Sequence, residues 1–221
     1  MYDVNVISSM HREWGNCNTV ELYKIIEGIR PEVIFEELDY PRFNEAYKEK
    51  QPFSVETDTI TMYLQNHIIE HIPVDTYDTP EINREKKSFM ENFIASNNNE
   101  YKKILIIQTK LAWQYGFNAL NSKQFNELTE MIKNQEEIFY QSTDNEKFKK
   151  IYEDWIKFNN NREYEMIRNI YNYSKEHQYN NAIFFVGADH SNSINRKIQE
   201  YKENDIKINW IFNIKDLSIN N

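Results

Sequence analysis

The sequence predicts an α/β fold: a central, largely parallel sheet with a mixed edge, flanked by helices, with a helical insertion in the middle of the chain. Short apolar runs typical of buried strands lie near both ends of the sequence, and amphipathic segments follow them. Between these parts, residues 81–158 keep a helical periodicity. The 221 residues suit one domain, 1–221, in which 81–158 is an insertion or lid.

The N-terminal part of the chain predicts a strand–helix–strand unit. Residues 3–9 and 33–37 are apolar runs consistent with buried strands. Between them, Asn18 and Glu21 are placed as a capping box for a helix. Because short connections join the three segments, the two strands should be parallel. The apolar face of the helix consists of Leu22, Ile25, Ile26 and Ile29.

The middle of the chain predicts mainly helices. Residues 57–71 should form a helix that Pro73 ends, and a brief strand should run through Val74. Within 81–158, Ser122 is placed as a helix cap. The apolar residues after this cap keep the i, i+3, i+4 spacing of a helix, and they are Phe125, Leu128, Ile132 and Phe139.

The last third of the chain returns to strands and helices. A helix should begin at Arg162, and residues 182–186 form the most hydrophobic strand candidate of the sequence. A polar helix should follow as far as about Tyr201. Apolar residues alternate strictly from Ile206 to Ile214, which predicts a half-exposed strand at the edge of the sheet.

Charge and composition narrow the classes of function. The net charge of −9 disfavours general nucleic-acid binding, which needs a basic surface. The single cysteine, Cys17, cannot form an internal disulfide and is typical of a reducing compartment. No basic-then-apolar signal precedes the first strand, and no apolar run approaches bilayer length. We therefore expect a cytoplasmic protein with no membrane or nucleic-acid partner, and the sequence leaves its oligomeric state open.

Four polar clusters follow predicted strands. They are 8–11 (SSMH), 36–37 (EE), Asp75 with Asp78, and 187–190 (GADH). Ligands of open α/β sheets bind beyond the carboxyl ends of the parallel strands, so these clusters should converge on one cleft. The first and last clusters both place a histidine three positions after a small residue. Gly187 should let the backbone turn sharply and let a ligand approach closely.

The two histidines and Glu37 can support hydrolytic chemistry. His11 or His190 can act as a general base near neutral pH or as a neutral metal ligand. Glu37 can hold a metal, orient an imidazole or take a proton. A purely structural interpretation, in which these residues cap helices and satisfy strand-end amides, suits any single histidine better. The convergence of the whole set favours the functional interpretation.

Two other signals compete with this site. His67, Glu70 and His71 form the H-x-x-E-H pattern of inverted zinc peptidases, which needs both histidines on one helix face. Because Pro73 ends the predicted helix at once, we do not expect these histidines to bind zinc together. Cys17 has no recognised protease context, so a small buried thiol is the better interpretation.

Several motifs resemble the TraB/Tiki proteins. Residues 30–42 read RPEVIFEELDYPR, similar to the Arg-Pro-Asp-hydrophobic-Glu-Leu, then Arg, signature of that family. Asn161 and Arg162, with Met166 downstream, resemble its Arg-Asn/Asp-x-x-Met helix start. Residues 185–190 match its second Gly-x-x-His motif, and residues 8–11 stand where the first belongs, with Ser8 in place of glycine. The matches run from near the N-terminus to about residue 194 and leave out the helical middle.

The same fold houses erythromycin esterases and ChaN-like haem-binding proteins. The resemblance implies a hydrolase that activates water, by histidine or by a divalent metal such as Mn, Co or Zn, on an ester or peptide-like substrate. It also allows a non-catalytic module that binds haem or a peptide end. The catalytic residues that it implies are His11, Glu37, Arg162 and His190, of which His11, Glu37 and His190 are candidate metal ligands. Arg162 would steady a developing negative charge or form a structural pair with Glu36 or Glu37. The substrate-binding candidates are Glu36, Arg42, Asp75, Asp78 and Gly187.

Overall fold

A computed structural model describes residues 1–49, 54–76, 80–201 and 206–212. In this part of the chain, five strands form one sheet in the order β3-β2-β4-β1-β5. The strands are β1 (Tyr2–Ser9), β2 (Val33–Glu36), β3 (Glu70–Pro73), β4 (Asn181–Gly187) and β5 (Ile208–Phe212). The helices are α1 (Thr19–Ile29), α2 (Tyr40–Tyr47), α3 (Val55–Leu64), α4 (Pro80–Asn97), α5 (Asn99–Leu120), α6 (Lys123–Ser142), α7 (Glu146–Glu176) and α8 (Ser191–Glu200).

The predicted α/β fold with a central parallel sheet is confirmed. Every strand pairing in the sheet is parallel, including those of the two edge strands, β3 and β5, so neither edge is mixed. The predicted edge strand is β5. The strands of the N-terminal unit, β1 and β2, are parallel as expected, but β4 lies between them.

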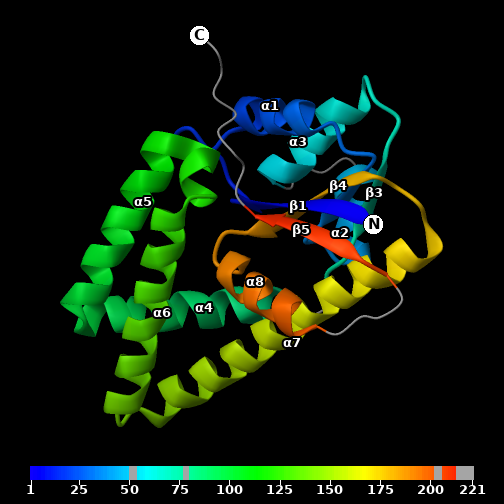
Figure 1. Ribbon diagram of the computed structural model, residues 1–221. Helices are drawn as coiled ribbons and strands as arrows, with labels where there is room; N and C mark the ends of the chain where they lie inside the picture. Colours follow the sequence, from blue (N-terminus) through cyan, green and yellow to red (C-terminus); the bar gives the residue numbers. More distant parts are fainter. Residues whose placement is uncertain (50–53, 77–79, 202–205, 213–221) are drawn as a thin grey trace.

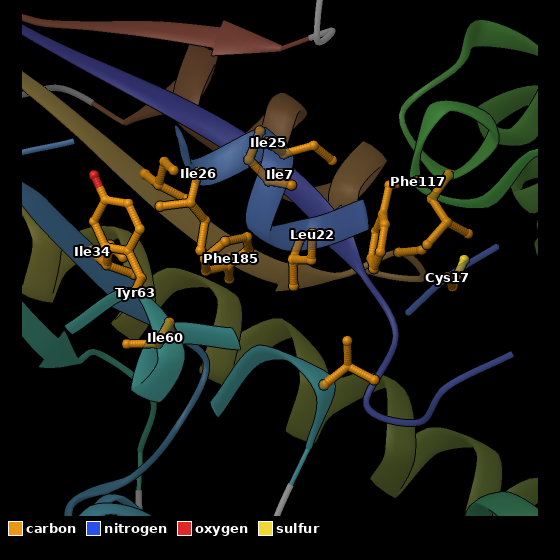
Figure 2. Close-up of a cluster of buried hydrophobic side chains, with 14 of the residues drawn as sticks. Ile7, Cys17, Leu22, Ile25, Ile26, Ile34, Ile60, Tyr63, Phe117 and Phe185 are labelled. Carbon is orange, nitrogen blue, oxygen red and sulfur yellow. The ribbon is translucent and has the colours of Figure 1, made fainter. Parts of the chain in front are cut away.

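Both faces of the sheet are covered by helices, with a hydrophobic core on each (Figure 1). Neighbouring residues of β4 point to opposite faces: Phe185 belongs to the core under α1 and α3, whereas Phe184 belongs to the core under α7 and α8. Figure 2 shows Leu22 and Ile26 of α1 beside Phe185 in the first of these cores. Because both faces of β4 are buried, its sequence reads as a continuous apolar run.

A third hydrophobic cluster lies among the helices of the chain's middle. It joins Met90 of α4, Tyr101 of α5, Ile132 of α6 and Phe148 of α7. Figure 1 shows these helices beside the sheet, while the second half of α7 runs along one of its faces. The predicted helical insertion is therefore present. As predicted, Ser122 caps α6 by accepting a hydrogen bond from the Phe125 backbone at 3.1 Å.

Two expected helix boundaries are wrong. The helix expected over 57–71 ends at Leu64, and Glu70 and His71 lie in strand β3, which pairs with β2. Arg162 does not begin a helix, because α7 continues unbroken from Glu146 to Glu176. Its apolar face packs first on the helical cluster and then on the sheet, so one helix joins the insertion to the core. In the described segments, no helix is both long and apolar enough to cross a membrane.

Candidate active site

A cavity of about 620 Å³ lies at the carboxyl ends of the strands. Its floor is formed by His11 after β1, Glu37 after β2, Asp75 after β3 and His190 after β4. The walls come from α4, α5, α6, α7 and α8. A cavity of this size suits a drug-sized ligand. The strand-end clusters thus converge on one cavity, although Asp78 lies outside the described residues.

His190 forms a carboxylate–imidazole pair with Glu163 of α7. The Nδ1 atom of His190 lies 2.6 Å from Glu163 Oε1. Burial alone would raise the pKa of Glu163, but hydrogen bonds from His190, Lys197 and Ser193, with the charge of His190, lower it to about 2. The ionised carboxylate can only accept, so His190 donates through Nδ1. This hydrogen bond leaves Nε2 of His190 available for chemistry.

His190 is held within the site rather than on an open surface. Its side chain is 13% exposed. The residue stands directly before α8, and its backbone N–H donates to Gly187 at 2.9 Å. This turn directs the imidazole into the space between α7 and the sheet edge. Its Nε2 atom lies 3.7 Å from Glu37 Oε1.

Glu37 is a buried carboxylate at the centre of the site. Its Oε1 accepts from Arg162 Nη2 at 2.8 Å, and its Oε2 accepts from the Gly187 backbone at 2.5 Å. Burial by itself would raise the pKa of Glu37, but the positive charges of His190, Arg162 and His11 lower it to about 2. Glu37 is therefore ionised over the whole physiological range.

The chain turns directly after Gly187, as expected, and the His190 N–H donates to the Gly187 carbonyl. This turn does not need a positive φ at Gly187, whereas Gly15 and Gly116 have positive φ values. A Cβ atom at this position would stand 3.3 Å from Glu37 Oε2. The close approach that the sequence predicted is therefore real, but the group that approaches is the buried carboxylate of Glu37.

Arg162 joins two acidic strand ends. Its Nε and Nη2 atoms bind Asp75 at 3.0 and 2.5 Å, and Nη2 also binds Glu37. Arg162 is thus the structural partner of Glu37, as one of the two interpretations of the sequence proposed, whereas Glu36 is not its partner. No contact of Nη1 with an acceptor is found among the described residues. The guanidinium also stacks over Phe158, 5.3 Å from the ring centre.

His11 forms a second carboxylate–imidazole pair, with Glu56 of α3. The two side chains are 3.4 Å apart, and Ser9 Oγ donates to the same Glu56 oxygen at 2.6 Å. Glu56 is the main cause that raises the pKa of His11 to about 9. The His11 side chain is 61% exposed, but the adjacent Glu56 carboxylate is buried and stabilises the protonated imidazole. His11 is therefore mainly protonated at neutral pH. His11 and His190 therefore have different surroundings. The positive charges of both lower the pKa of Glu37.

Two residues of this site were missed by sequence reasoning. Glu163 directly follows Arg162, but its hydrogen-bond partner, His190, lies 27 positions later in the chain. Glu56 stands in the first turn of α3, which Ser54 and Thr57 begin as a capping box. That local motif could have predicted the helix start. No local signal could have predicted that Glu56 meets His11.

The other substrate-binding candidates lie in different surroundings. Arg42 lines the cavity and pairs with Asp39 at 3.6 Å. Glu36 does not line this cavity, because its place in β2 turns it to the other face of the sheet. There it binds His71 at 2.8 Å and accepts from Tyr47 at 2.5 Å. Burial raises the pKa of Glu36. The structure thus separates Glu36 from the proposed substrate cavity.

The H-x-x-E-H pattern does not lie on a helix. His67 follows α3 and stacks on Tyr63 with ring centres 3.9 Å apart, whereas His71 lies in β3 and binds Glu36. The geometry of the inverted zinc peptidase motif is therefore not formed. Cys17 is a buried thiol, as expected, and burial raises its pKa to about 12.

The residues present do not form a set of donors that fits a divalent metal. Both oxygens of Glu37 accept from protein groups, and the Arg162 guanidinium occupies the cation position beside it. His11 is paired with Glu56, and Nδ1 of His190 donates to Glu163, so Nε2 is the one ring nitrogen of His190 that remains as a metal donor. In the described parts of the chain, no three His, Cys, Asp or Glu side chains are grouped so that they could hold a metal ion.

No protein-family model matches the chain, and no match is found to a curated protein or to a solved structure. The TraB/Tiki resemblance therefore stays a prediction.

Proposed function

We propose that the protein is a hydrolase in which His190 activates water at the carboxyl edge of the sheet. The observation that carries this proposal is the His190–Glu163 pair, whose 2.6 Å hydrogen bond fixes the imidazole by Nδ1 while Nε2 faces Glu37 and the cavity. A carboxylate that holds one ring nitrogen orients the other for proton transfer. The TraB/Tiki resemblance supports the same class of reaction.

His11 has a different role in this mechanism. Protonated and paired with Glu56, it donates a proton to the leaving group. In its neutral form, His190 takes a proton from water through Nε2, and the water oxygen attacks the carbonyl carbon of an ester or amide. The bond to the leaving oxygen or nitrogen then breaks as His11 protonates that atom. The products are an acid and an alcohol or amine, and proton exchange with solvent restores both histidines.

Arg162 and Glu37 define the electrostatic field between the two histidines. The Arg162 charge is shared with Asp75 and Glu37, so it orients Glu37 and also lowers the negative charge at the cavity floor. Its Nη1 nitrogen is the group that would stabilise an oxyanion. The proposed mechanism therefore uses these side chains themselves and no metal ion.

A non-catalytic binding module is the second candidate. The cavity size and the helical side chains on its walls favour it, because such a cavity can hold a small apolar ligand without reaction. Haem or a peptide end is the ligand class that the resemblance allows. Binding without turnover would support this candidate.

A panel of activated esters, lactones and amides tests the hydrolase proposal. Wild type should hydrolyse at least one class, and His190→Ala should lower kcat/KM about a hundredfold or more. His177→Ala is the matched control, because His177 is exposed and stacks on Tyr173 outside the cavity. Equal activity of the His190 and His177 variants would refute the assignment of the base.

A further inference from the structure

The part of the cavity away from the sheet edge is lined by helices of the helical insertion. We call this part the helical chamber and define it by six apolar side chains: Met90, Leu105, Ile132, Trp155, Ile156 and Phe158. They come from α4, α5, α6 and α7. Figure 1 shows these helices gathered beside the carboxyl ends of the strands. The chamber and the two histidines therefore share one cavity.

The back wall of the chamber is preformed. Met90 and Ile132 belong to the buried cluster of the insertion, and Leu105 and Trp155 pack against it. Ile156, in contrast, is 46% exposed although it lines the cavity. When an apolar ligand covers large apolar side chains that face an open cavity, the burial of apolar surface stabilises the complex.

Positive and negative groups around the chamber are close to balanced in charge. Lys87 of α4 binds the Asp189 carboxylate at 2.9 Å, and Lys133 of α6 donates to the Asp189 backbone at 3.0 Å. Burial, followed by the charge of Asp189, raises the pKa of Glu136 to about 7. The two ammonium groups of Lys87 and Lys133 balance the carboxylates of Asp189 and Glu91, and the raised pKa of Glu136 reduces its negative charge. Little net charge therefore calls for a counter-ion on the ligand, so an uncharged ligand suits the chamber best.

One buried polar atom points to a ligand or water in the cavity. Oδ1 of Asn159, a cavity-lining residue of α7, is buried and has no hydrogen-bond partner among the described residues. Buried acceptors are nearly always satisfied, so this oxygen needs a donor from outside the protein. A water molecule retained in the cavity can supply this donor, since the carbonyl of an ester can only accept.

We propose that the substrate is an uncharged ester with an extended apolar group, and that this group lies in the helical chamber while the carbonyl lies between His11 and His190. This inference rests on the proposed hydrolase function. It adds the class of substrate and assigns the specificity to the insertion, in particular to Trp155 and Ile156 of α7.

Methyl ketones of increasing chain length test the chamber without any reaction. They resemble the ester carbonyl but cannot be hydrolysed. Each added methylene should improve affinity by up to about fourfold until the chamber is filled. The series from 2-butanone to 2-decanone is measured with calorimetry on the wild-type protein. A flat series would overturn the chamber as the site of the apolar group.

Two variants locate the binding site. Ile156→Arg places a charge at the chamber, and it should weaken the binding of 2-octanone at least tenfold. Ile138→Arg is the control, since Ile138 is also exposed on α6, at 55% against 46% for Ile156, but does not line the cavity. Trp155→Phe should remove most of the fluorescence change on binding without abolishing binding. Equal effects of the two arginine variants would overturn the placement.

The ketones and the esters separate the two proposals. If p-nitrophenyl esters are hydrolysed but rate and ketone affinity do not depend on chain length, the chamber inference fails and the hydrolase survives. If ketone affinity rises with chain length and no ester is hydrolysed, the hydrolase fails and the binding chamber stands.

Discussion

Replacing Glu163 by glutamine should lower the free energy of unfolding by about 3 kcal/mol at pH 7. Glu163 is buried, and it accepts hydrogen bonds from His190, Ser193 and Lys197. Its pKa falls from 4.5 to about 2 in the folded protein, and each pKa unit corresponds to about 1.4 kcal/mol. Glutamine keeps the shape of the side chain but leaves the buried Lys197 ammonium without its counter-charge.

The pH dependence of this effect follows from its sign. Because the folded-state pKa of Glu163 is lowered, its contribution to stability is fully present above the unfolded pKa of about 4.5 and is lost as pH falls toward about 2. The difference between wild type and Glu163→Gln should therefore shrink as the pH is lowered through this window.

Urea unfolding followed by circular dichroism at pH 7 and at pH 3 measures this difference. Glu165→Gln is the control, because Glu165 lies on the same helix in a more exposed ion pair with Arg168. It should change stability by no more than about 1 kcal/mol. A loss for Glu163→Gln that is equal at both pH values, or no larger than that of the control, would refute the role assigned to the carboxylate.

Three further predictions concern other parts of the molecule. If His11 is the proton donor, the hydrolysis rate should fall as pH rises through about 9, and Glu56→Gln should shift this decrease to lower pH. An unchanged pH profile of the Glu56 variant would contradict the role of the His11–Glu56 pair. Ser54→Ala should lower the free energy of unfolding by about 1 kcal/mol, because it removes the capping box that Ser54 forms with Thr57. Thermal unfolding can test this. Cys17 should resist thiol reagents at pH 8 in the native protein and react in concentrated urea, since burial raises its pKa; rapid native labelling would contradict this.

Local patterns in the sequence were sufficient to predict β1, β2, β4 and β5 and the carboxyl-end clusters, but they misplaced β3. The apolar run of β4 and the alternation in β5 report the burial of each strand, because side chains alternate between the two faces of a sheet. Parallel strands place their carboxyl ends on one edge, so the convergence of His11, Glu37 and His190 on one cavity followed from topology. The caps at Asn18 and Ser122 were visible for the same local reason.

Only the tertiary structure decided the partners of these residues. The pairs His11–Glu56 and His190–Glu163 join a strand end to a helix that lies distant in sequence, and no local pattern encodes such a contact. The error at His71 has the same origin: the helical pattern continued, but pairing of β3 with β2 satisfied the backbone better than another helical turn. The sequence by itself therefore determined which side chains reach the sheet edge, whereas long-range packing determined their charges, because these depend on the carboxylate that each histidine meets.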